Sequence, residues 1–273
     1  MVELVAHSDP YPSDSLRWVA AEVRIPPSPD LAQSVPTALR DYVRPQFPVL
    51  DEEARLNVVV GTASPQQVLR RRFLTRDRVM SLTFSKDGVT LETTQYAGWS
   101  NFRGVFVAAL EELSKTARPD GILRVGLRYI DEIRIPQPPA SPIEWAGWVA
   151  EGLIAPFALH DPHRLSNAMV LLQYGEQPGF ATTFRASPFP RGRTVLPQGA
   201  LRLPVETPED AYFLFDTDSS WSDPERKVPE FDAPFISSLL DQLHEPCVAL
   251  FEASITDKLR AEVLRRPRAP ATV

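Results

Sequence analysis

The chain has 273 residues, 43% of them hydrophobic and 23% charged, so it can bury a substantial core and is not expected to be disordered over most of its length. Its net charge of -6 gives no global attraction to nucleic acid or anionic membranes, and no apolar run approaches the roughly 20 residues of a membrane-spanning helix. The single cysteine, Cys247, cannot form an internal disulfide, and the first residues lack the features of a secretion signal, so we expect a cytoplasmic protein.

Alternating apolar residues and turn signals predict an antiparallel meander followed by a helix in the first half. The expected strands are Leu16 to Ile25, Leu56 to Val60, Gln67 to Leu74, Arg78 to Phe84 and Val89 to Gln95, with a short helix around Pro36 to Val43. Asp87-Gly88 is the strongest turn signal. After Gln95 the apolar period becomes about 3.6, which predicts a helix from Ser100 to Thr116 with Ser100 as its N-cap.

The segment from Ile122 to Ile135 predicts one half-buried strand, because charged and apolar side chains alternate along it. Its charged residues are Arg124, Arg128, Asp131, Glu132 and Arg134. The next seven residues, 136–142, contain four prolines and read as a linker. We therefore expect an N-terminal half over residues 1–135 and a C-terminal half over 143–264.

The second half repeats this order of elements. The expected elements are a short helix from Ile143 to Leu153, strands at Ser166 to Tyr174, Gly179 to Ser187, Ala200 to Pro204 and Ala211 to Asp216, and a long helix from Phe235 to Val263. Pro246 should kink or divide that helix, and residues 265–273 should form a disordered tail. The predicted fold is α+β, with two related halves that arose by internal duplication, each an antiparallel meander sheet with a helix packed on one face.

Two segments, residues 95–102 (QYAGWSNF) and residues 124–131 (RVGLRYID), carry a family resemblance. They resemble the Tyr-x-Gly-Trp-x-x-Phe and Arg-x-Gly-Leu-Arg-Tyr-Ile-Asn motifs of a sporadically distributed family of uncharacterised bacterial proteins, whose final helix resembles residues 243–256. Asp131 stands where that family usually has asparagine, and Pro246 interrupts the segment of this chain that corresponds to the family's final helix. The resemblance implies no activity, cofactor or catalytic residue. In its order of elements the chain also resembles a doubled SecB-type chaperone fold, an analogy that does not imply function.

Few residues suggest chemistry, because the common phosphate-binding and nucleophile motifs are absent from the sequence. The run from His160 to His163 could offer ligands to zinc, and the acidic residues between Asp216 and Glu225 could bind a divalent cation, but each also reads as a solvated loop. Cys247 lies on the apolar stripe of the last helix and reads as a core residue. We expect no catalytic residue, no metal and no cofactor.

The candidate binding residues form two groups. One is a basic patch of Arg70, Arg72, Arg76 and Arg78, and the other comprises Trp99, Arg124, Arg128, Tyr129 and His244. If the arginines share one face, they could take an acidic protein or nucleic-acid phosphates. Alternatively they form a salt-bridge network inside the fold with Asp77, Glu92, Asp131 and Glu132.

The function we expect is that of a non-enzymatic, cytoplasmic protein-interaction module that holds another protein through sheet surfaces or edges, within a defence or toxin–antitoxin locus. One alternative is an enzyme or small-ligand binder with a pocket between the halves, lined by Trp99, Tyr129, Arg128 and His244. Another is a nucleic-acid binder acting through the Arg70 to Arg78 region. The oligomeric state is left open.

Overall fold

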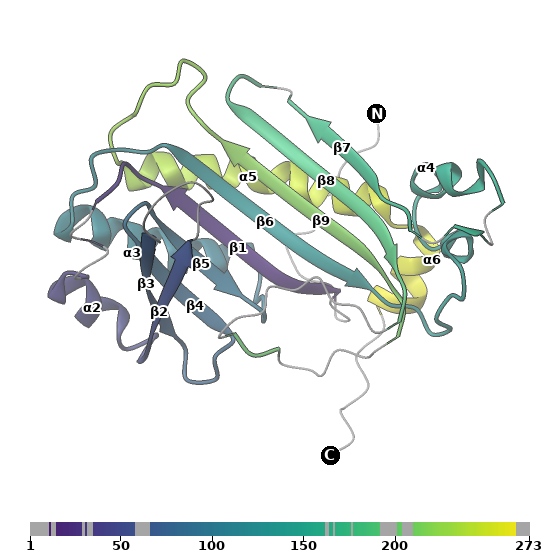
Figure 1. The fold of residues 1–273 in the computed structure, drawn as a ribbon, viewed down its shortest axis with the longest axis horizontal. Helices are drawn as coiled ribbons and strands as arrows, with labels where there is room; N and C mark the ends of the chain where they lie inside the picture. Colours follow the sequence, from purple (N-terminus) through teal and green to yellow (C-terminus); the bar gives the residue numbers. More distant parts are fainter. Residues whose placement is uncertain are drawn as a thin grey trace.

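A single antiparallel sheet of nine strands forms the centre of the molecule, and two long helices cover one of its faces (Figure 1). The computed structural model describes residues 11, 15–28, 31, 35–57, 66–161, 164–165, 167–175, 177–191, 201–203 and 210–265, with the backbone alone for 52–57 and 66–69. The α+β class with an antiparallel sheet is confirmed. Within these residues no helix is both long enough and apolar enough to cross a membrane.

Most elements lie near their predicted positions. The second strand, however, begins before the expected Leu56, and the helix expected from Ile143 to Leu153 is only a 3-10 turn and a four-residue helix. The strands are β1 (Leu16–Arg24), β2 (Val49–Asn57), β3 (Gln66–Leu74), β4 (Met80–Ser85), β5 (Gly88–Thr93), β6 (Arg124–Ile133), β7 (Val170–Tyr174), β8 (Phe180–Phe189) and β9 (Tyr212–Trp221). The helices are α2 (Thr37–Val43), α3 (Trp99–Thr116), α4 (Glu151–Ile154), α5 (Ala233–Ser254) and α6 (Asp257–Leu259), with 3-10 turns at Pro142–Trp145 and Ala155–Ala158 and a π-helical turn at Arg260–Leu264.

The strand order is β2-β3-β4-β5-β1-β6-β9-β8-β7, so strands from both halves of the sequence join in one sheet. We had placed β6 at the end of the first half. It pairs with β1 along one side and with β9 along the other, and thereby connects the two meanders. The outer edges of the sheet are β2 and β7.

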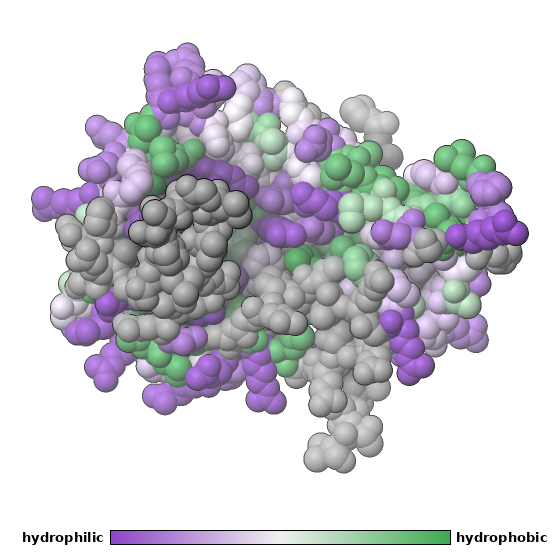
Figure 2. All heavy atoms as spheres, in the orientation of Figure 1, coloured by the Kyte–Doolittle hydropathy of each residue, from purple (hydrophilic) through white to green (hydrophobic). Residues whose placement is uncertain are grey.

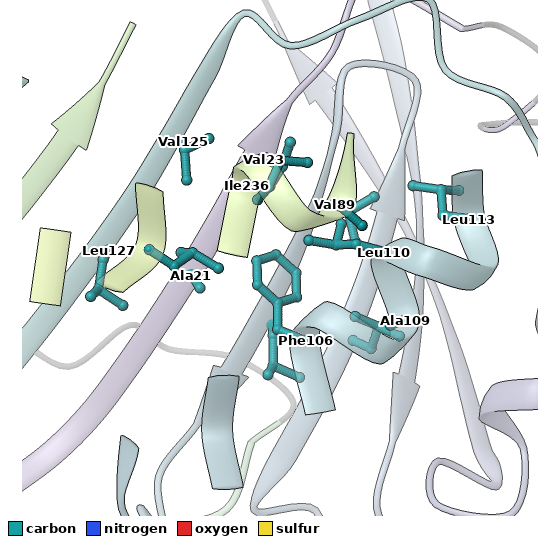
Figure 3. Packing of buried hydrophobic residues seen from close by; sticks show 14 of the residues in the cluster. Ala21, Val23, Val89, Phe106, Ala109, Leu110, Leu113, Val125, Leu127 and Ile236 are labelled. Carbon is teal, nitrogen blue, oxygen red and sulfur yellow. The ribbon is translucent and has the colours of Figure 1, made fainter. Parts of the chain in front are cut away.

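The main core lies between the sheet and its two long helices. Phe106 and Leu110 of α3 and Ile236 of α5 are fully buried against the apolar side chains of β1, β5 and β6 (Figure 3). On β6, Val125 and Leu127 face these helices, because alternate residues of a strand point to the same face of its sheet. The apolar face predicted for this strand therefore forms part of the core.

Two predictions about helix boundaries were wrong. Ser100 is not the N-cap of α3, because the helix begins one residue earlier, after Gly98, whose φ of 101° lets the chain turn there. Pro246 does not divide the helix expected from Phe235 to Val263, since α5 continues to Ser254, and a kink there stays a prediction. The break comes later, at Ile255 and Thr256, before α6. A proline removes the hydrogen bond to the carbonyl four residues before it, and that residue, Gln242, is exposed, so water can satisfy its carbonyl.

Further differences concern the chain around β9. Of the strand expected from Ala200 to Pro204, the structure describes 201–203, which are not a strand: Arg202 lies beside the β3–β4 turn, its amide donating to the Arg78 carbonyl at 2.7 Å. Asp216 and Asp218 lie within β9, which runs on to Trp221, and so are not in a loop. Of the predicted tail, residues 265–273, Arg265 caps the π-helical turn and 266–273 lie outside the described residues.

Candidate functional site

The sheet separates the residues that we had grouped as one binding site. Trp99, Tyr129 and His244 meet on the helix-covered face, whereas Arg124 and Arg128 project from the opposite face. Arg128 and Tyr129 are neighbours on β6 and so point to opposite sides of the sheet. The pocket lining that combined Arg128 with the three aromatic residues is therefore not formed.

The three aromatic residues are in direct contact. The rings of Trp99 and His244 stack with centroids 4.2 Å apart and planes 10° from parallel. The Tyr129 hydroxyl lies 2.9 Å from Nδ1 of His244, and the Trp99 indole N–H donates to Asp241 at 2.8 Å. Tyr96 adds an edge-on contact to the Tyr129 ring. We call these four aromatic residues the aromatic corner. They hold the start of α3 against α5, and their rings pack on one another.

Burial controls the protonation of the aromatic corner. It lowers the pKa of His244 from 6.5 to about 4, an effect that the nearby Asp241 carboxylate partly opposes. Burial also raises the pKa of the Tyr129 hydroxyl. Near neutral pH the hydroxyl is thus protonated and the imidazole neutral, so either group can supply the hydrogen of the bond between them, according to the tautomer of His244. This pair has the chemistry of a structural hydrogen bond and not that of a general acid or base.

The two arginines of β6, Arg124 and Arg128, form salt bridges with carboxylates of the same chain. Arg128 binds Asp216 through two hydrogen bonds of 2.7 and 2.8 Å, and Arg185 reaches the same carboxylate at 3.2 Å. Arg124 pairs with Glu22 of β1 at 2.9 Å and with Asp218 of β9 at 3.3 Å. Salt bridges inside the fold were one of the two predicted alternatives for these arginines.

The carboxylates predicted to pair with Arg124 and Arg128 have other partners. Glu132 is fully buried and pairs with Arg134 at 2.9 Å and with Arg17 at 3.5 Å. Asp131 accepts a hydrogen bond from Ser15 at 2.9 Å. Asp77 accepts one from Thr75 in the β3–β4 turn. The Arg134–Glu132 pair joins two members of the predicted network. Arg124 and Arg128 pair instead with carboxylates outside it.

The basic patch is divided between a strand and a turn. In the register of β2 and β3, Arg70 and Arg72 stand opposite Glu53 and Asp51. Arg72 is buried, and its Nε lies 3.4 Å from the Thr83 hydroxyl. Arg76 and Arg78 are exposed in the turn that follows. Opposite charges that face each other across a strand pair stabilise it, so Arg72 opposite Asp51 favours the pairing of β2 and β3.

The other candidate chemical groups are engaged in the fold or exposed. Cys247 is buried, burial raises the pKa of its thiol, and the thiol donates to the Leu243 carbonyl at 3.2 Å. His160 is exposed, and His163 lies outside the described residues. Where the structure describes the chain, no group of three or more His, Cys, Asp or Glu side chains could hold a metal ion.

Sequence reasoning missed the edge formed by Met169 to Tyr174, the β7 edge. Leu171 is 54% exposed, and Met169, Leu172 and Tyr174 are exposed as well. Figure 2 shows hydrophobic surface over this part of the sheet. Residues 169–174 contain no charge and no proline, a local signal that was present in the sequence. Natural proteins commonly protect edge strands with charged residues or proline. An exposed apolar edge that has neither therefore indicates an interaction surface.

Compared with known proteins, the chain matches no protein-family model, and no curated protein matches it. Its function is therefore argued from the residues described above.

Proposed function

We propose that the protein is a non-enzymatic, cytoplasmic interaction module that holds another polypeptide at the β7 edge, and that it serves in a bacterial defence or toxin–antitoxin locus. The observation that supports this is the exposure of an uncharged apolar strand at the end of the sheet.

An edge strand offers backbone N–H and C=O groups that can pair with a further strand. Proteins use this mode to bind extended segments, in which main-chain hydrogen bonds give affinity and alternate side chains give specificity. At the β7 edge, Leu171 lies on the outer face of the sheet and Leu172 and Tyr174 on the helix-covered face. An added strand would cover apolar surface on both faces, which favours association.

The opposite edge of the sheet has a different composition. Along β2, residues 51–53 are all acidic and Arg55 follows them. Charges along an edge strand disfavour pairing with other chains. The contrast with the uncharged β7 edge supports a binding role for β7 alone.

The two alternative functions have less support. For a small-ligand site, the aromatic residues that would line it already stack on and hydrogen-bond to each other. For nucleic-acid binding, Arg72 stands opposite Asp51 in the register of β2 and β3, which lowers the positive potential of that surface.

The internal duplication and the SecB-type topology also remain proposals. The strand order supports duplication: β1 pairs with β5 and β6 with β9, so each meander returns to its first strand, and a long helix, α3 or α5, then follows. The two copies would then begin at β1 and β6, which pair with each other within the sheet. Membership of the sporadically distributed bacterial family rests on the two sequence motifs.

Co-purification from the native host tests the proposed function. The tagged full-length protein, Leu171→Lys and Leu50→Lys would be isolated in parallel and their bound proteins identified by mass spectrometry. Leu50 is a matched control, because it is 47% exposed on the other edge strand, β2. We expect a stoichiometric partner with the wild type and Leu50→Lys and its loss with Leu171→Lys. Absence of any partner, or equal recovery with all three proteins, would contradict the proposal.

A further inference from the structure

We propose that, in the purified protein, the β7 edge is occupied by a second copy of this chain, so that two sheets join through antiparallel β7 strands around a twofold axis. This inference rests on the proposed function, because it assigns the resting occupant of the same edge. A foreign partner would have to displace that copy, and dimerisation would protect the edge until the partner arrives.

Charge favours a second copy as the occupant. Met169 to Tyr174 has no charged residue, so two β7 strands meet without like-charge repulsion and without burying an unpaired charge. Two β2 strands would bring acidic residues 51–53 of each copy together, which is unfavourable. The sheet thus has one edge that is compatible with itself and one that is not.

Symmetry also favours this pairing. Two identical strands that pair antiparallel around a twofold axis form a closed, isologous contact, and the dimer stops there. Pairing of β7 with β2 of the next copy would be head-to-tail and would continue into a filament. With the axis perpendicular to the sheet, Leu171 of each copy stays on the outer face, and both helix layers stay on the other face.

The geometry of such a pair gives a direct test by cross-linking. In a twofold antiparallel ladder, one residue stands opposite its own counterpart, with Cβ atoms about 4.5 to 5.5 Å apart. A cysteine at that position comes near enough to its counterpart for an oxidant or a short bifunctional reagent to link them. The natural Cys247 is buried and would not compete. Cysteines placed singly at Leu171, Leu172 and Gln173 sample the centre of the strand.

The experiment measures the mass of the full-length protein by light scattering over a wide range of concentration. We expect twice the 30.5 kDa of the chain at high concentration and dissociation on dilution, with a Kd on the order of micromolar because a short edge buries little area. Leu171→Lys should be a monomer, and Leu50→Lys should dimerise like the wild type. One of the three cysteine variants should form a covalent dimer.

A monomeric wild type at all concentrations would overturn the inference, as would a dimer that persists in Leu171→Lys or the failure of all three cysteines to cross-link. Circular dichroism of Leu171→Lys checks that it is folded, and the cysteine variants give a readout that does not depend on it. A monomer that still binds a host protein through Leu171 would contradict the dimer and leave the proposed function intact. The reverse result, a dimer without any host partner, would contradict the proposed function.

Discussion

His244 should make the protein lose stability as the pH falls from about 6.5 to about 4, and His244→Gln should remove this loss. In the unfolded chain the imidazole binds a proton below its ordinary pKa of 6.5, whereas in the folded protein burial lowers that pKa to about 4. Between these values the unfolded state binds more protons, so acid favours unfolding. The contribution is complete above pH 6.5 and is lost as the pH falls to the folded pKa.

The size of the effect follows from the two pKa values of His244. Each tenfold change in proton affinity corresponds to about 1.4 kcal/mol, so the full difference is about 3 kcal/mol. Glutamine does not titrate in this range and can still accept a hydrogen bond from Tyr129. His244→Gln should lose some stability at every pH, because it removes the stack on Trp99.

Urea denaturation of both proteins at several pH values between 4 and 7 measures the free energies of unfolding. Acidic side chains such as Asp77 titrate in both proteins, so the difference between the two curves isolates the histidine. We expect the wild type to lose about 2 to 3 kcal/mol more than His244→Gln over this range. Parallel curves would refute the reasoning and would mean that the imidazole is not held neutral by burial.

Other predictions concern the ion pairs and the close packing of β-strands. Asp216→Asn should lower the free energy of unfolding by about 2 to 3 kcal/mol in urea denaturation, since it weakens the hydrogen bonds of two half-exposed arginines, including Arg128; a change below about 0.5 kcal/mol would contradict this. Gly88→Ala should cost about 2 kcal/mol, because its new Cβ would lie 2.7 Å from the Val23 carbonyl oxygen, which is fixed backbone. Gly126→Ala should cost less than about 1 kcal/mol in the same assay, because there the obstacle is the end of a flexible arginine, and an equal cost at both glycines would count against this account.

Local alternation predicted one apolar and one charged face for β6, and the structure agrees as far as Tyr129. Beyond it, Ile130 lies on the same face as Arg128, and Asp131 lies on the helix-covered face. Local alternation did not predict the ion pairs across strands. Arg128 meets Asp216 because β6 pairs with β9, and that pairing depends on how the two meanders join. Of the carboxylates in the predicted network, Glu92 lies on β5, which β1 separates from β6, whereas Asp131 and Glu132 lie on β6 itself. Partner choice therefore needs strand order, which a local pattern does not contain.

The aromatic corner and the β7 edge show the same limit. We placed Trp99 and His244 in one candidate site from the sequence, but their stacking depends on how α5 lies against α3, which a local pattern does not contain. The uncharged run at Val170 to Tyr174 reads locally as an ordinary strand. Its importance comes from its position at the end of the sheet, where no other strand of the described residues pairs with its outer side.

On the proposed function, the β7 edge is the surface on which the protein holds another polypeptide. The most direct measurement places a photo-crosslinking amino acid at Leu171, and in a matched variant at Leu50, and maps the linked peptides by mass spectrometry after irradiation of the native host. We predict a crosslink from position 171 to a strand of a partner protein or of a second copy, and little or none from position 50. No crosslink from position 171, or equal crosslinking from both positions, would contradict the claim.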